Sequence, residues 1–189
     1  NNRVRLFAPG GPPPSDVPDS IEGSCRIDVD KRAGPESVEQ GGEVTIILDI
    51  GGRCPDGDGR IDVALVLDRS GSMIGAPIAA ARRAAVAFLG ELAPGAAQVA
   101  LIGFSTSEEV LQALTGDFQR VVRGVRRLVA NGQTNYAPAL EAGRLELEGP
   151  AARDDVNHVL VMMTDGSPTD RSSATRAADA VKAAGITLY

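Results

Sequence analysis

The sequence lacks several features that mark common classes of protein. It has no tryptophan, its aromatic residues make up only 3% of the 189 positions, and it has one histidine. With so few aromatic rings, we expect no stacking platform for nucleic-acid bases or sugars. No apolar run approaches the roughly 20 residues that a membrane-spanning helix needs. The chain is therefore expected to have no membrane span and no ligand site built on aromatic stacking.

The charge balance is acidic, with 19 lysines and arginines against 25 acidic residues and a net charge of -6. An excess of negative charge disfavours nucleic acid as a partner and suits a protein that binds cations. Hydrophobic residues make up 43% of the chain, which is enough for one good core and a smaller module.

The chain is organised around the stretch from Asp62 to Met73. Residues 63–67 form an apolar run that is typical of a strand buried on both faces. The run ends in Asp68, Ser70 and Ser72, whose side chains all carry oxygen. Open α/β sheets bind ligands at the carboxyl ends of their strands, so a binding site is expected here. The alternative interpretation is that Asp68 and Ser70 only cap the helix that follows.

Two later segments favour the binding site. The segment GQTN at 132–135 precedes a predicted helix over 136–148. The segment MMTDG at 162–166 ends a second buried strand and contains Asp165. The tips of neighbouring parallel strands lie side by side, so Asp165 can come close to Asp68.

Together the DRSGSM stretch at 68–73 and these two segments resemble the von Willebrand factor type A (vWA) domain family. The matches fall in the family's order, and the resemblance covers residues 60–189, about two thirds of the chain. It implies an α/β fold with a doubly wound, mostly parallel sheet. In that family the matching positions form a metal-ion-dependent adhesion site (MIDAS). Carried over to this chain, the metal ligands would be Asp68, Ser70, Ser72, Thr134 and Asp165.

The sequence departs from the family's pattern at two points. Gln133 stands where a glycine is common, and no acidic pair follows Met73. The second departure removes the calcium site that some family members carry beside the MIDAS. One metal ion is therefore predicted in this domain.

The predicted ligands select the kind of cation. All are oxygens, which favour a hard ion such as Mg²⁺, Mn²⁺ or Ca²⁺ over zinc or copper. Only Asp68 and Asp165 bring formal charge, so a divalent ion is no more than neutralised. If Asp165 acts through water, the ion stays electrophilic, and a carboxylate from a partner protein can take the open position. A hydrolase would also need a positioned general base, and His158 starts its strand at the end opposite Asp165.

The first 59 residues are expected to form two parts. Residues 1–23 are rich in proline and glycine, which is typical of a leader or linker. Residues 24–59 predict a small β-module, and VDKRAGPESVEQGGEVTIILDI at 29–50 is similar to the opening of immunoglobulin-like repeats in bacterial surface proteins. Such repeats have about seven strands. A partial β-sandwich is therefore expected, completed by sequence beyond Tyr189 or by another chain.

Cys25 and Cys54 frame this β-module. A disulfide between them would close a loop and stabilise a module with a small core by roughly 3 to 4 kcal/mol. Export from the cell would allow the disulfide to form. The alternative is two unpaired buried thiols in a cytosolic protein. The disulfide is the favoured interpretation, and with it a secreted or cell-surface location.

Residues 60–189 follow an alternating β/α pattern. Residues 98–105 predict a buried strand, and 109–114 predict a short antiparallel strand at the edge of the sheet. A helix with an apolar stripe is predicted next, and a further helix is predicted over 172–184. A last strand starts at Ile186, and the fold that the resemblance implies would need more sequence, or a partner chain, to cover this edge. The apolar stripe consists of Phe118, Val121, Val122, Val125, Leu128 and Val129.

Four arginines lie off the apolar stripe of that helix, at positions 120, 123, 126 and 127. We interpret them as a solvated face, with a patch for an acidic partner as the alternative. Arg69, inside the DRSGSM stretch, either frames an acidic ligand or points to solvent.

The sequence therefore predicts a metal-dependent protein-binding or adhesion module of a secreted or cell-surface protein, and not an enzyme. Its ligand would be a protein with an exposed Asp or Glu. The alternative is a structural subunit of a surface filament or pilus-like assembly. In that case the β-module pairs between copies, and the metal mainly stabilises the loops.

Overall fold

A computed structural model describes residues 26–34, 45–53 and 59–189 of the chain. Two initial strands are followed by a mixed series of strands and helices, in which β5 directly follows β4, α3 directly follows α2, and η1 is a short 3-10 helix. Their order is β1 (Arg26–Gly34), β2 (Thr45–Arg53), β3 (Ile61–Asp68), η1 (Gly71–Met73), α1 (Ala76–Glu91), β4 (Ala97–Phe104), β5 (Glu108–Thr115), α2 (Phe118–Arg127), α3 (Tyr136–Glu148), β6 (Asn157–Met163), α4 (Arg171–Ala183) and β7 (Thr187–Leu188).

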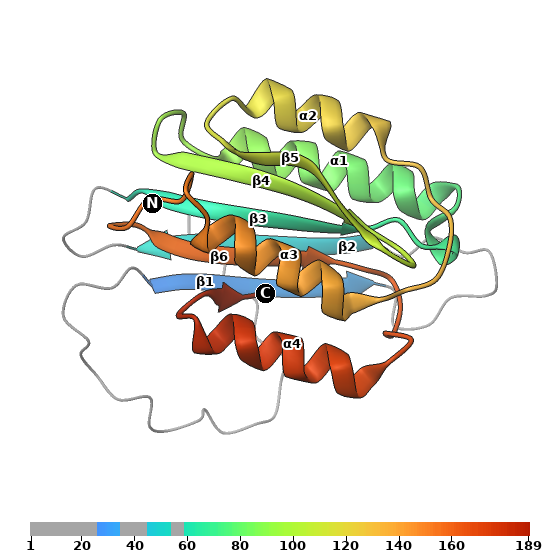
Figure 1. The fold of residues 1–189 in the computed structure, drawn as a ribbon. Coiled ribbons are helices and arrows are strands. Elements are labelled where there is room, and N and C mark those ends of the chain that lie inside the picture. Colours follow the sequence, from blue (N-terminus) through green and yellow to red (C-terminus); the bar gives the residue numbers. More distant parts are fainter. Residues whose placement is uncertain (1–25, 35–44, 54–58) are drawn as a thin grey trace, which may run out of the picture.

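Five of the strands form one sheet in the order β5-β4-β3-β6-β7 (Figure 1). β4, β3, β6 and β7 run parallel, and β5 pairs antiparallel with β4 at the edge. Leu67 of β3 lies opposite both Gly103 of β4 and Met163 of β6, so the three strands end together. The mostly parallel sheet and its antiparallel edge strand confirm the fold class predicted from the sequence.

Helices cover both faces of this sheet, which gives three layers (Figure 1). Val63, Leu65 and Leu67 pack in the core beneath α1 and α2, whereas Ala64 and Val66 pack in the core beneath α3 and α4. A strand points successive side chains to opposite faces. An unbroken apolar run is therefore needed in β3 because both of its faces are covered.

The predicted apolar stripe of α2 fails at its last residue. Val121, Val125 and Leu128 are buried, but Val129 is 64% exposed. α2 ends at Arg127, and the backbone of Leu128 already has a ψ of 132°. The placement of Val129 on the stripe is therefore wrong, because the helical period stops before this residue.

β1 and β2 form a separate antiparallel pair, in register from Arg26 opposite Arg53 to Gly34 opposite Thr45. Strands are the structure that the predicted β-module requires in this region. The leader over 1–23 lies outside the described residues, as do Cys25 and Cys54 and the disulfide predicted between them. The partial β-sandwich and the domain limits at residues 23 and 59 stay predictions.

None of the helices in the described residues has both the length and the hydrophobicity that a bilayer-spanning helix needs. The longest of them, α1, has 16 residues and contains Arg82 and Arg83.

Candidate metal centre at the carboxyl end of the sheet

Asp68 is the last residue of β3, and its side chain is 0% exposed. Its Oδ1 accepts a hydrogen bond from the backbone N–H of Ser70 at 2.7 Å. Its Oδ2 accepts a hydrogen bond from the hydroxyl of Thr164 at 2.6 Å. Thr164 follows β6, so this second bond joins the tips of two neighbouring strands. Both carboxylate oxygens therefore have fixed directions.

The alternative that Asp68 and Ser70 cap the following helix is wrong. α1 begins at Ala76 with Gly75 as its N-cap residue, and no side chain caps it. Ser70 precedes η1, and its side chain makes no capping hydrogen bond there either. The side-chain oxygens at positions 68 and 70 are therefore left for another role.

A series of hydroxyl contacts links Ser70 to Asp165. The Oγ atoms of Ser70 and Ser72 lie 3.0 Å apart. The hydroxyl of Ser72 donates a hydrogen bond to Oδ1 of Asp165 at 2.8 Å. Four of the five predicted ligands thus belong to one connected group of polar contacts: Asp68, Ser70, Ser72 and Asp165.

Thr134, the fifth predicted ligand, lies in the loop before α3, which backbone hydrogen bonds hold against the other two loops. The N–H of Gly71 donates to the carbonyl of Gly132 at 2.9 Å, and the N–H of Thr169 donates to the carbonyl of Thr134 at 2.9 Å. Among the described residues, no side chain hydrogen-bonds Oγ1 of Thr134. The structure therefore brings the Thr134 loop to the site. The contacts that hold the loop there are hydrogen bonds of its backbone and not of the Thr134 side chain.

Gly132 allows this loop to approach the tip of β4. Its φ of +80° lies in the left-handed region that favours glycine. A Cβ at this position would lie 2.7 Å from Oγ1 of Thr106 and 3.2 Å from Oγ of Ser105. Oγ1 of Thr106 in turn accepts a hydrogen bond from the N–H of Gln133 at 3.0 Å. A glycine at position 132 is thus required by close packing as well as by its backbone conformation.

Two supporting residues were missed by the sequence analysis, Thr164 and Tyr136. The Tyr136 hydroxyl lies 3.0 Å from Oγ1 of Thr164 and 2.5 Å from the carbonyl oxygen of Gly166. Burial raises the pKa of the Tyr136 phenol, the Thr164 hydrogen bond opposes this, and the charges of Asp68 and Asp165 raise the pKa further. The phenol is therefore protonated at neutral pH and can donate. The signal available for Thr164 was its place directly before Asp165.

The donor set fits a hard divalent cation. Asp68 is fully buried, and no arginine, lysine or histidine of the described residues forms an ion pair with it. Burying such a charge without a partner costs several kcal/mol. Two oxygens bound at right angles to Mg²⁺ at about 2.1 Å lie about 3 Å apart, and the Oγ atoms of Ser70 and Ser72 are 3.0 Å apart. Within residues 26–34, 45–53 and 59–189, no group of three or more His, Cys, Asp or Glu side chains offers a competing site.

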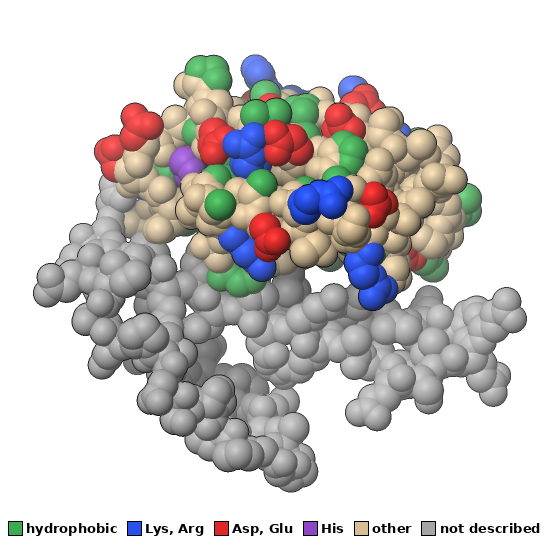
Figure 2. Space-filling model, turned by 60° about the horizontal axis from the view of Figure 1, so that its bottom comes forward, with side chains coloured by type: hydrophobic (Ala, Val, Ile, Leu, Met, Phe, Trp, Pro, Cys, Tyr) green, Lys and Arg blue, Asp and Glu red, His purple; other side chains and the backbone are tan. Residues whose placement is uncertain are grey.

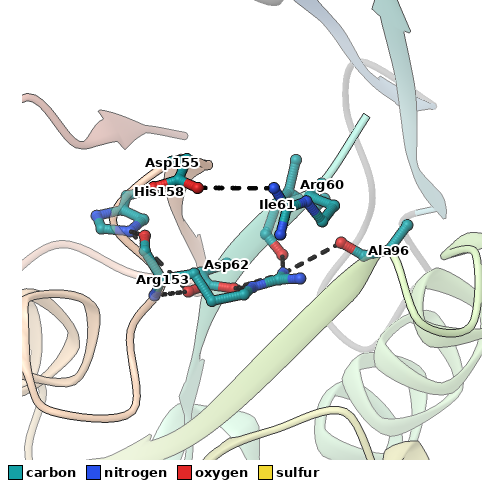
Figure 3. Close-up of polar contacts among 7 residues, drawn as sticks. All are labelled: Arg60, Ile61, Asp62, Ala96, Arg153, Asp155 and His158. Carbon is teal, nitrogen blue, oxygen red and sulfur yellow. Dashed lines mark hydrogen bonds and ion pairs between the residues drawn. The ribbon is translucent and has the colours of Figure 1, made fainter. Parts of the chain in front are cut away.

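A second buried aspartate, Asp62, lies at the opposite end of β3 and is fully paired (Figure 3). Nε and a terminal nitrogen of Arg153 donate to its Oδ1 at 2.9 and 2.6 Å, and the Arg153 backbone N–H donates to Oδ2 at 2.8 Å. The same guanidinium donates to the carbonyls of Ile61 and Ala96. Nε2 of His158 lies 3.0 Å from the carbonyl oxygen of Arg153. His158 is thus at the end of the sheet opposite the candidate metal centre, as predicted.

The fold and the site define an α/β domain with a hydroxyl-rich candidate cation site at the carboxyl end of a mostly parallel sheet. The chain belongs to the von Willebrand factor type A domain family, whose model matches residues 62–189. Domains of this family are generally interaction modules rather than enzymes, and they commonly bind a divalent metal at a MIDAS.

Solved structures with a similar fold come from several kinds of protein. The conserved hypothetical protein BatB from Bacteroides thetaiotaomicron is 21% identical with a TM-score of 0.60, and 68% of this chain aligns with 64% of that one. Manganese-loaded TRAP protein from Plasmodium vivax is 18% identical with a TM-score of 0.58, over 87% and 60% of the two chains. The PilB minor pilin from Streptococcus sanguinis is 19% identical with a TM-score of 0.52, over 75% and 47%. The chain spans less than two thirds of each structure, and these likenesses show the fold. A search of curated proteins finds no match.

Proposed function

We propose that this chain is a metal-dependent protein-binding module, of the adhesion type, in a secreted or cell-surface protein. The module binds one cation. Mg²⁺ is the favoured ion, and Mn²⁺ and Ca²⁺ are the alternatives. An Asp or Glu carboxylate of a partner protein completes its coordination. The proposed ligands are Asp68, Ser70, Ser72, Thr134 and Asp165.

The environment of Asp68 carries this proposal. Its carboxylate is 0% exposed, has no cationic partner among the described residues, and is followed by two serine hydroxyls in mutual contact. Burying a carboxylate in its charged form is costly, and a cation beside it offsets that cost. The hydroxyl ligands are neutral and Asp165 acts through water, so the ion stays electrophilic towards an external carboxylate.

Titration calorimetry with MgCl₂ and MnCl₂ tests the metal site. The wild-type chain is expected to bind one ion, and Asp68→Ala is expected to bind none. Asp179→Ala is the matched control, because it removes an exposed carboxylate on α4 away from the site. Equal affinity of the wild type and Asp68→Ala contradicts the proposed ligand set.

The open coordination position is tested with acetate as a carboxylate probe. Bound Mn²⁺ accelerates the relaxation of solvent protons, and this effect is expected to fall as acetate displaces a coordinated water. The fall is expected in the wild type and in Asp179→Ala. An effect that acetate does not change would mean that the metal has no position for a partner's carboxylate.

The alternative is a structural subunit of a surface filament, in which the metal only stabilises the loops. The β1–β2 pair favours it, because two strands bury little apolar surface alone and gain by pairing with another chain. Under this alternative, assembly survives Asp68→Ala and is lost when residues 1–54 are deleted. Light scattering of the purified variants distinguishes the two functions.

A further inference from the structure

A groove between β5 and α2 has an excess of arginine that the candidate metal centre does not explain. α2 packs beside β4 and β5 at the edge of the sheet (Figure 1). The groove between them, which we call the β5–α2 groove, has a volume of about 610 Å³. Its lining includes four arginines, Arg69, Arg120, Arg123 and Arg127.

Three of these arginines lie on one face of α2. Positions 120, 123 and 127 are three and four residues apart, so their side chains are neighbours on the helix surface, and like charges at this spacing destabilise a helix. Arg120 pairs with Asp117 at 3.1 Å. Arg123 and Arg127 form no ion pair with any described residue. They are a local excess of positive charge on a chain whose net charge is -6.

An arginine of another helix is neutralised within its own helix. On α3, Arg144 forms ion pairs with Glu141 at 2.6 Å and with Glu148. Figure 2, which looks onto the side of the molecule where α4 lies, shows acidic and basic side chains interspersed. The β5–α2 groove differs from this arrangement, because two of the arginines that line it have no acidic partner among the described residues.

Arg69 connects the groove to the candidate metal centre. It follows Asp68 directly, and its side chain is 18% exposed and pairs with Glu109 of β5 at 3.2 Å. Its Nε is buried and has no hydrogen-bond partner. The exposed part of its guanidinium lines the groove, where an acidic group can contact it.

We propose that the β5–α2 groove binds an acidic, partly apolar segment of a partner protein. β5 is an edge strand of its sheet, and an extended segment can add to such an edge through its backbone. Its acidic side chains meet Arg123 and Arg127, and its apolar side chains cover Val110 and Val129, which are 44% and 64% exposed. A nucleic acid fits this groove less well, because Glu109 and the two valines line it.

The inference goes beyond the proposed function, because the groove contacts need no metal. The test therefore selects nine-residue peptides from a random displayed library against the wild-type chain in EDTA. The selected peptides are expected to be rich in Asp and Glu. For the double variant Arg123→Glu/Arg127→Glu they are expected to lose about tenfold or more in affinity, because two of their charged contacts become repulsive.

The matched control is Arg83→Glu/Arg126→Glu, which makes the same change in net charge at exposed positions outside the groove. Its affinity for the peptides is expected to stay within about twofold of the wild type when both are measured in added salt. The salt screens the long-range attraction that any loss of positive charge weakens. Circular dichroism melts check that both double variants fold. If Arg123→Glu/Arg127→Glu does not fold, Arg123→Gln/Arg127→Gln replaces it.

Four outcomes overturn the inference. The selection can give no binding peptide or no enrichment of acidic residues, or the selected peptides can bind both double variants equally. A labelled single-stranded oligonucleotide that binds more tightly than the selected peptides assigns the groove to nucleic acid instead. Because EDTA is present throughout, none of these results bears on the metal centre, which calorimetry tests separately.

Discussion

Asp62 and Asp68 lie at the two ends of the same strand, and both side chains are 0% exposed. The guanidinium and backbone N–H of Arg153 surround Asp62, so its charge is balanced within the chain. Asp68 accepts hydrogen bonds from a serine N–H and a threonine hydroxyl, so its charge is solvated but not balanced. The difference separates a structural end of the sheet from an end that is suited to an external cation.

The free-energy cost of burying an ionised group explains why the two ends behave differently. At Asp62 the compensating cation belongs to the protein, so the charge is balanced without an ion from the solvent. At Asp68 the compensating cation has to come from solution, so stability becomes coupled to ligand binding. Three changes test this contrast, from the largest expected effect to the smallest, and a fourth tests a carboxylate that caps a helix.

Arg153→Ala is expected to have the largest effect. It leaves the carboxylate of Asp62 buried without a cation, which should lower the free energy of unfolding by about 3–5 kcal/mol. Urea denaturation followed by circular dichroism measures the loss. Arg126→Ala, at an exposed position of α2, is the control and should change the free energy by less than about 0.5 kcal/mol. A loss below about 1 kcal/mol for Arg153→Ala would mean that the Asp62 end is not closed by this pair.

Asp68→Asn is expected to separate the two ends by their response to metal. In EDTA the variant should be at least as stable as the wild type, because an unbalanced buried charge is removed. With free Mg²⁺ at 100 times its Kd, the wild type should gain about 2.7 kcal/mol and the variant nothing. Asp62→Asn is the control, and its loss of stability should be the same with and without Mg²⁺. An equal Mg²⁺ gain in the wild type and Asp68→Asn would contradict the contrast.

Gly132→Ala tests the close packing of the Thr134 loop at the metal end. The change is expected to cost about 1–3 kcal/mol and to weaken Mg²⁺ binding, because the new Cβ meets Thr106. Gly95→Ala is the matched control, since Gly95 has a φ of +83° and nothing within 4 Å of its Cβ position. It should cost about 1–2 kcal/mol for its backbone alone and leave Mg²⁺ affinity unchanged. If both variants bind Mg²⁺ as the wild type does, the loop does not position a ligand.

The smallest expected effect concerns pH and the cap of α4. Asp170 accepts hydrogen bonds from the hydroxyl and N–H of Ser173, and then from those of Ser172, which lower its pKa from 3.8 to about 2. A lowered pKa means that the capping contribution is present above pH 3.8 and is lost as the pH falls through about 2. The small difference in Tm between the wild type and Asp170→Ala should therefore shrink from pH 5 to pH 2. A difference that does not change over this range would show that the carboxylate charge plays no part in the cap.

Long, regular hydrophobic patterns predicted the fold well. The helix expected over 136–148 is α3 with the same bounds, and the edge strand expected over 109–114 is β5 with one more residue at each end. Val129 was misplaced because an apolar residue at the right period does not show that the helix continues past Arg127. The end of a helix depends on backbone conformations that the pattern does not contain.

The candidate site was predicted in part. Asp68 and Asp165 were expected to meet because both follow buried parallel strands, and the contact of Asp165 with Ser72 brings them into one group. Thr164 and Tyr136 were missed, because a hydroxyl that supports a site has no motif of its own. The binding of a metal by these residues stays a prediction.

Local sequence was sufficient to place the oxygen-rich loops, because an apolar run followed by acids and hydroxyls marks the tip of a buried strand wherever it occurs. It placed the site at Asp68 but did not show that the charge of Asp62, at the other end of the same run, is balanced within the chain. Their difference depends on Arg153, which reaches Asp62 from 91 positions away. Charge pairs over such distances arise only when the folded chain brings the two side chains together.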